Sequence, residues 1–232
     1  MRLDKLICIS TTLTRDEATR CILAGEVTVD GELITDIRCQ VHTHRDIRLN
    51  GEKLIPRPFR YLLIHKPKNT ICSNKDEAYP SVFTHVDLPD HSELHVVGRL
   101  DADTTGLVLA TDDGHWSFDI IRPESHCKKV YRVGLSRPLP SGAADRLRTG
   151  VIFQGITEPT LPAALESVTP TEVLLTITEG KYHQVKRMFA AVGNRVVALH
   201  REQIGDVRLD IKEGQWRALT ADEVASFVKI TD

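Results

Sequence analysis

The segment from Gly98 to Leu107, with the sequence GRLDADTTGL, constrains how this chain folds more than any other. It places one carboxylate, Asp101, in a polar loop between the apolar runs 96–97 and 107–109. Aspartate is disfavoured inside strands, whereas loops on a rigid scaffold often carry functional side chains. The pattern therefore predicts two strands joined by a loop that presents Asp101. Taken alone, the stretch leaves open an aspartate that only hydrogen-bonds its own turn.

The size and composition are those of an ordinary globular protein. A chain of 232 residues holds one large domain or a small one plus a medium one, and its residues are 41% hydrophobic and 27% charged. No stretch reaches the ~18 uninterrupted apolar residues of a membrane-spanning helix. The start, residues 1–5, does not have the pattern of a signal peptide. We therefore expect a cytoplasmic protein without a membrane partner.

The five cysteines are scattered and include no C-x-x-C pair. Reduced structural thiols are the expectation for such a set. Cys39, His42 and His44 lie close together in sequence, but a fourth ligand at a suitable spacing is missing. No metal site is therefore expected.

The net charge of −2 argues against a nucleic-acid protein, but its distribution is uneven. Residues 1–60, 61–125 and 126–232 carry net charges of +1, −6 and +3, and the stretch from Lys181 to Arg201 holds five basic residues and no acid. A local basic patch can bind phosphates even on an acidic protein. An ordinary solvated face fits the same pattern, so charge leaves both interpretations open.

The first fifty residues have the signals of a compact unit. Thr14 and Glu17 have the spacing of a capping box at a helix start, and Gly25 is a helix stop. Asp30-Gly31 between two alternating runs predicts a two-residue hairpin, and residues 46–49 predict a further short strand. Residues 52–59 contain two prolines and are interpreted as a linker.

The remainder predicts an α+β domain around a mostly antiparallel, mixed sheet flanked by helices. Residues 61–64 form a candidate buried strand followed by a turn at Asn69, a residue that tolerates a left-handed conformation. Further strands are predicted at residues 95–97, 106–111, 128–134, 172–178 and 206–210. The apolar stripe Val185, Met188, Phe189 and Val192 predicts a helix over 184–192, ended by Gly193.

Three motifs in order now carry a family resemblance. Gly98, Arg99, Leu100, Asp101, Thr105, Gly106 and Leu107 resemble the catalytic loop of pseudouridine synthases of the RsuA/RluA family. The segments 129–133 (KVYRV) and 179–188 (EGKYHQVKRM) match two further family motifs, and residues 199–205 and 214–220 extend the match nearly to the end of the chain. Each motif is weak alone, but their order makes the signal strong.

The resemblance implies a site without a cofactor, built from one carboxylate, one ring and one cation. Asp101 is implied to be the nucleophile, attacking either C1′ of the ribose or C6 of uracil, with Asp103 in a supporting or exposed role. Tyr131 is implied to stack on the target base, and Lys186 to pair with Asp101 and favour its charged form. The further implied substrate contacts are Arg99, His183, Gln184 and Arg187, the last also being the second choice for the partner of Asp101.

The N-terminal residues resemble an S4 RNA-binding domain, through Arg2-Leu3-Asp4-Lys5, Thr14-Arg15 and Gly25-x-Val27-x-Val29-Asp30-Gly31. The candidate RNA contacts are Arg2, Lys5, Arg15 and Arg20. We therefore expect an S4 domain at 1–52, a linker at 53–59 and a catalytic domain at 60–232.

The resemblance implies a monomeric bacterial enzyme that isomerises a uridine of 16S rRNA, the family target being uridine 516, in a partly assembled 30S particle. Lys rather than Arg at position 186 favours the small-subunit branch. The alternatives are a 23S rRNA enzyme of the same family and a non-catalytic S4-type ribosome-assembly factor. A hydrolase using Asp101 and Asp103 as an acid and a base explains fewer of the motifs.

Overall fold

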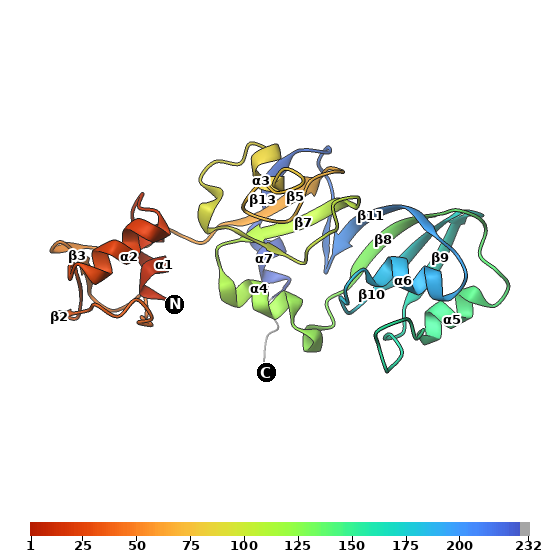
Figure 1. The fold of residues 1–232 in the computed structure, drawn as a ribbon, viewed down its shortest axis with the longest axis horizontal. Helices are drawn as coiled ribbons and strands as arrows, with labels where there is room; N and C mark the ends of the chain where they lie inside the picture. Colours follow the sequence, from red (N-terminus) through yellow and green to blue (C-terminus); the bar gives the residue numbers. More distant parts are fainter. Residues whose placement is uncertain (228–232) are drawn as a thin grey trace. The chain divides into compact units, whose positions relative to one another are not determined.

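The computed structural model describes residues 1–227, and the chain divides into two compact units. Unit 1 comprises residues 1–59 together with 90–93, and unit 2 comprises residues 60–89 and the chain from 94 onward. Figure 1 labels the helices and strands of both. Within residues 1–227, no helix is long and apolar enough to cross a membrane.

Unit 1 packs two helices against a small sheet. The helices are α1 (Leu3–Ser10) and α2 (Arg15–Leu23), and the strands β1 (Val27–Val29), β2 (Glu32–Leu33), β3 (Ile47–Leu49) and β4 (Glu52–Lys53) pair antiparallel in the order β2-β1-β3-β4. Both hydrogen bonds of the capping box between Thr14 and Glu17 are present at the start of α2. The turn between β1 and β2 places Asp30 and Gly31 at φ values of +50° and +86°. The predicted helix start and hairpin are thus confirmed.

The first residue of the segment expected to be a linker lies in a strand. Lys53 belongs to β4, whose register pairs it with Arg48 of β3, so strand pairing continues past the expected boundary at residue 52. Residues 54–60 then run as irregular chain into unit 2.

Unit 2 is built on a mixed sheet, which within the described residues has nine strands. They are β5 (Tyr61–Lys66), β6 (His95–Val97), β7 (Thr105–Thr111), β8 (Lys129–Leu135), β9 (Ala164–Thr169), β10 (Glu172–Ile177), β11 (Val196–Ile204), β12 (Val207–Arg208) and β13 (Trp216–Ala218). The main path runs β13-β5-β7-β11-β8-β10-β9, with β6 on β7 and β12 on β11. Only the β7–β11 pair is parallel among these pairings. The predicted fold class is confirmed, although the strand expected at 206–210 covers only two residues.

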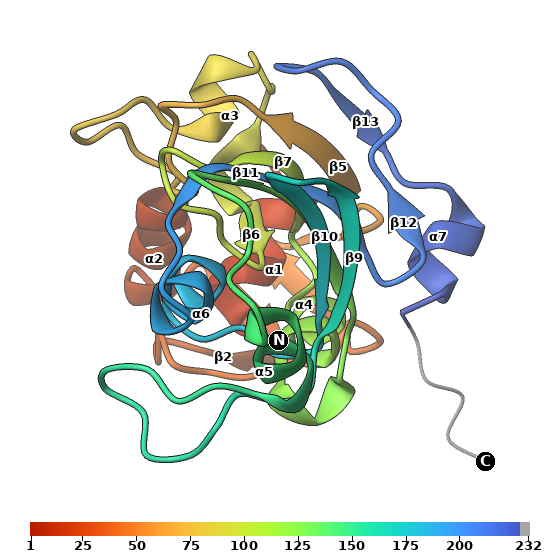
Figure 2. The ribbon, with the colours of Figure 1, turned by 90° about the vertical axis from the view of Figure 1, so that its right-hand side faces the viewer.

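Helices cover both faces of this sheet. They are α3 (Val82–His85), α4 (Gly114–Ile121), α5 (Ala143–Thr149), α6 (Gln184–Ala191) and α7 (Ala221–Ala225). Alternation along β5 sends Leu62 and Ile64 into the cluster with α3, while Leu63 packs with α4. At the other end, α5 and α6 share one core with β8, β9 and β10, and Figures 1 and 2 show both helices beside these strands.

Helix α6 has the amphipathic stripe that the sequence predicts. Val185, Met188 and Phe189 are buried in the shared core, and the helix stops before Gly193, whose φ is +75°. Its first turn therefore has a fixed position against β8 and β10, and the side chains on its opposite face point away from the core.

Candidate active site

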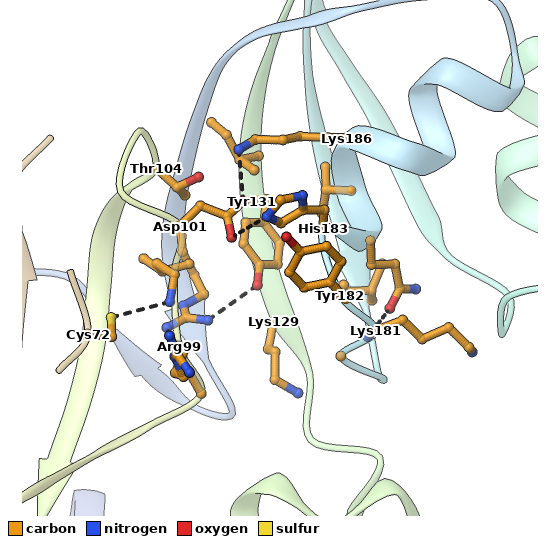
Figure 3. Close-up of a pocket in the computed structure, with 18 of the residues that line it drawn as sticks. Cys72, Arg99, Asp101, Thr104, Lys129, Tyr131, Lys181, Tyr182, His183 and Lys186 are labelled. Carbon is orange, nitrogen blue, oxygen red and sulfur yellow. Dashed lines mark hydrogen bonds and ion pairs between the residues drawn. The ribbon is translucent and has the colours of Figure 1, made fainter. Parts of the chain in front are cut away.

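A cavity of about 680 Å³ lies in unit 2, where the loop after β6, the strand β8 and the start of α6 meet. Its lining includes Arg99, Asp101, Tyr131, His183 and Lys186. Figure 3 shows these side chains coming from three separate stretches of the chain. A cavity of this size is in the range of sites that take a small molecule or a single nucleotide.

Both carboxylate oxygens of Asp101 have a partner from the start of α6. Lys186 donates from Nζ to Oδ2 at 2.8 Å, and His183 Nε2 lies 3.2 Å from Oδ1. The Asp101 side chain nevertheless keeps 31% of its surface exposed. The carboxylate is therefore fixed in orientation and still reachable from the cavity.

Lys186 serves two carboxylates at once, since its Nζ also donates to Asp103 Oδ1 at 2.6 Å. Burial alone would lower the pKa of Lys186, but the hydrogen bonds to Asp101 and Asp103 raise it above its ordinary value. The bond to Lys186 in turn lowers the pKa of Asp103. The lysine thus carries its proton at neutral pH and offsets the charge of both acids.

Lys66, the last residue of β5, stabilises the loop that carries Asp101 through hydrogen bonds to backbone carbonyl oxygens. This side chain is fully buried, and its Nζ donates to the carbonyl oxygens of Thr104 at 2.8 Å and Pro67 at 3.0 Å. Burial lowers the pKa of Lys66 below its ordinary value. Asn69 has a φ of +61°, as its turn predicts, and its backbone N–H donates to Ala102 O at 2.8 Å. The end of β5 therefore fixes the backbone on the far side of Asp101.

Arg201 of β11 ties the same loop to β7 and to β8. Its buried guanidinium donates to Leu107 O at 2.8 Å, to Gly98 O at 2.5 Å and to the Tyr131 hydroxyl at 3.3 Å. The parallel pairing of β7 and β11 requires glycine at position 106. A Cβ built there would lie 2.3 Å from Arg201 O, and the φ is +111°.

Strand β8 supplies the floor of the cavity. Its burial alternates and turns Lys129, Tyr131 and Val133 inward. Tyr131 is 7% exposed. Lys129 donates from Nζ to Cys127 O at 2.9 Å, and burial lowers its pKa. A ring and a cation thus line the side of the cavity across from the loop.

The corner between β10 and α6 is braced by a small polar network. Gln184 accepts from the Lys181 backbone N–H at 2.8 Å and donates to Glu179 at 2.7 Å, while Lys181 pairs with Glu179. His183 takes a left-handed backbone conformation, with a φ of +50°. This turn places its ring against Asp101.

The structure brings some of the residues that the sequence nominates together in the cavity and leaves others outside it. Asp101, Lys186, Tyr131 and His183 meet in the cavity, Arg99 is exposed at its edge, and buried Gln184 braces the corner. Arg187 is not among the described residues that line the cavity. Its guanidinium lies 4.3 Å from the Phe153 ring and donates to Tyr182 O. Arg187 is therefore neither the partner of Asp101 nor part of the cavity wall.

The nominated basic residues of unit 1 have mixed surroundings. Arg2 and Arg15 both approach the buried carboxylate of Asp4, at 2.7 and 3.9 Å, whereas Arg20 is exposed and Lys5 is half-buried. Two of the four thus have part of their charge offset inside the unit.

Sequence reasoning missed Lys66, Lys129 and Arg201 as parts of the site. The two motifs that contain Lys129 and Arg201 were recognised, but neither residue stood out from its neighbours. Lys66 and Arg201 act through backbone carbonyl oxygens, which every residue possesses, so their partners leave no signal in the residue types.

Comparison with known proteins identifies the family of this chain. The family model for RNA pseudouridylate synthase matches residues 60–191. A protein of Escherichia coli (strain K12) named "Ribosomal small subunit pseudouridine synthase A" is 46% identical over 98% of this chain and 100% of its own. A Vibrio cholerae protein of the same name is 45% identical over 99% and 100%. A crystal structure titled as a pseudouridylate synthase covers 98% of this chain and all of its own, with 43% identity and a TM-score of 0.72.

The fold and the carboxylate-centred cavity thus define an RNA-modifying isomerase. The chain belongs to the RNA pseudouridylate synthase family, whose enzymes convert uridine in RNA to pseudouridine.

Proposed function

We propose that this enzyme isomerises one uridine of small-subunit ribosomal RNA, the family target being uridine 516 of 16S rRNA. The observation that carries the chemistry is Asp101, with both oxygens anchored and its carboxylate open to a cavity that also contains Tyr131. The choice of RNA is supported by relatives that match nearly the full length of this chain and are named for the small subunit.

The reaction needs one nucleophile and rearranges the atoms of uridine without adding any. An Asp101 oxygen attacks either C1′ of the ribose or C6 of the uracil ring, and the N1–C1′ bond breaks. The base then turns, C5 bonds to C1′, C5 loses its proton and N1 gains one, and the carboxylate is released. Because the product is an isomer of the substrate, no oxidant, reductant or second substrate is consumed.

The other side chains of the cavity prepare this step. Lys186 and His183 hold the carboxylate, so that little reorientation is needed at the moment of attack. Tyr131 provides the surface on which the uracil stacks after it leaves the RNA helix. Arg99, exposed at the edge of the cavity, is suited to a phosphate or to the space that the flipped base vacates.

Unit 1 serves in this proposal as an S4-type RNA-docking module, in which Arg20 and Lys5 supply charge that Asp4 does not offset. Arg2 and Arg15 contribute with part of their charge offset, Arg2 by Asp4 and Arg15 by Asp4 and Glu93. We further propose that the enzyme acts as a monomer in the cytoplasm. Its proposed substrate is a partly assembled 30S particle, since a base in an RNA loop costs less free energy to flip than one in a complete helix.

The test is to incubate the purified chain with 16S and 23S rRNA, each bare and partly assembled with ribosomal proteins, and to map new pseudouridines. A single new pseudouridine in 16S rRNA supports the proposal. Product in 23S rRNA would contradict the substrate assignment. RNA binding without any product would instead favour a non-catalytic assembly factor.

A further inference from the structure

We propose that Tyr182 and His183 form a second stacking site, which holds the base next to the target uridine after that uridine has flipped. This inference rests on the proposed function. Tyr182 lies in the cavity lining and is 76% exposed, although an aromatic ring normally buries its apolar surface. Such a ring at the edge of a reaction cavity is suited to an apolar partner that arrives with the substrate.

The two rings are already stacked on each other. Their centroids lie 3.8 Å apart with an interplanar angle of 21°, and Figure 3 shows them side by side. His183 covers one face of the Tyr182 ring, and its Nε2 lies 3.2 Å from Asp101 Oδ1. A base placed on the exposed tyrosine would therefore continue a stack that ends at the nucleophile.

The Tyr182 ring is restrained by its stack on His183, and the backbone that carries the two rings is held by further contacts. Arg187 donates to Tyr182 O at 3.1 Å while its guanidinium packs on Phe153. His183 has a φ of +50°, a left-handed conformation that is uncommon for residues other than glycine. A ring held in advance loses less conformational freedom when a ligand stacks on it.

Tyr182 and Tyr131 lie in different environments, so they suit bases at different positions of the RNA. Tyr131 is 7% exposed inside the cavity, where it can meet a single inserted base. When that base leaves the RNA stack, its neighbour loses a stacking partner, which is part of the cost of flipping. Tyr182 can replace that partner at the mouth of the cavity. Because every base has a flat π-face, the contact would tolerate any base at that position.

The experiment uses the full-length enzyme and a 16S rRNA fragment that it modifies, together with two versions that carry an abasic site on the 5′ or the 3′ side of the target. The variants are Tyr182→Ala, Tyr182→Phe and Tyr79→Ala, the last altering a tyrosine of unit 2 that is 43% exposed and outside the cavity lining. We expect Tyr182→Ala to lower kcat/KM about tenfold on the intact RNA. Tyr182→Phe, which keeps the ring, should recover most of that loss, whereas Tyr79→Ala, outside the cavity lining, should stay within twofold of the wild type.

The abasic RNAs separate stacking from a merely structural role. One of the two abasic sites should lower the wild-type kcat/KM by a similar factor and lower that of Tyr182→Ala no further. An equal loss for Tyr182→Ala on all three RNAs, or no loss on the intact RNA, would overturn the stacking site and leave the proposed function standing. Failure of the wild type to form pseudouridine in any rRNA would overturn both.

Discussion

Replacing Lys186 by Met tests the electrostatic core of the site. Methionine has a similar length and suits a partly buried position, but it removes the ammonium that lies 2.8 Å from Asp101 and 2.6 Å from Asp103. The two carboxylates then share one small volume without a counter-charge, and among residues 1–227 the partner left to the Asp101 carboxylate is His183. We expect both the charge balance and the orientation of the nucleophile to suffer.

The size of the effect follows from the contacts. A hydrogen bond between charged groups contributes ~1.5–3 kcal/mol, and the lower end applies here because Lys186 and Asp101 are 27% and 31% exposed. About 1.5 kcal/mol corresponds to roughly a tenfold change in rate. A misplaced reacting group costs up to ~10²-fold. The expected fall in the rate constant of the chemical step therefore lies between about 10-fold and 10³-fold.

The assay is single-turnover pseudouridine formation with saturating enzyme, which measures the chemical step apart from RNA binding. Lys186→Arg restores a cation and should recover most of the rate, although its planar donors meet the carboxylates differently. Asp103→Asn leaves the Lys186–Asp101 contact in place and should stay within about threefold of the wild type. A single-turnover rate constant for Lys186→Met within threefold of the wild type would refute this reasoning.

Three further predictions concern the scaffold around the loop. Gly106→Ala, whose Cβ would lie 2.3 Å from Arg201 O, should lower the free energy of unfolding in urea by ~3 kcal/mol or more, whereas Gly114→Ala, with open space around it, should change it by less than ~0.5 kcal/mol. Burial lowers the pKa of Lys66, so between this lowered pKa and the ordinary value of 10.5 the unfolded chain binds more protons than the folded chain. The free energy of unfolding should therefore rise with pH in that interval. Lys66→Met should flatten that rise in urea titrations at successive pH values. Tyr131→Phe removes the hydroxyl that accepts from Arg201 at 3.3 Å and should cost ~1 kcal/mol of stability, measured by thermal unfolding.

Local patterns in the sequence predicted the elements whose physics is local. Three of these elements are present in the structure: the capping box at Thr14, the Asp30-Gly31 turn and the apolar stripe of α6. Each depends on residues that lie close together in the sequence. The short strand β4 was not predicted, because a two-residue strand depends on its partner, β3, and has almost no pattern of its own.

The site is less predictable because its contacts join distant parts of the chain. Lys186 and Asp101 are 85 residues apart, and a family resemblance was needed to pair them. The choice between Lys186 and Arg187 depends on helix geometry, since adjacent helical residues point about 100° apart and only one can face Asp101. Arg201 looked like one more charge in a basic run, because its carbonyl partners are invisible in the sequence.

The central claim is that Asp101 is the nucleophile, and the Asp101→Asn variant tests it most directly. Asparagine keeps the shape of the side chain but removes the charged oxygen that attacks. The measurement is pseudouridine formed in rRNA by equal, folded amounts of the wild type and the variant, with RNA affinity determined in parallel. We predict that the variant binds the RNA within a few-fold of the wild-type affinity and forms no pseudouridine. Product formation by Asp101→Asn at a rate near that of the wild type would contradict the account.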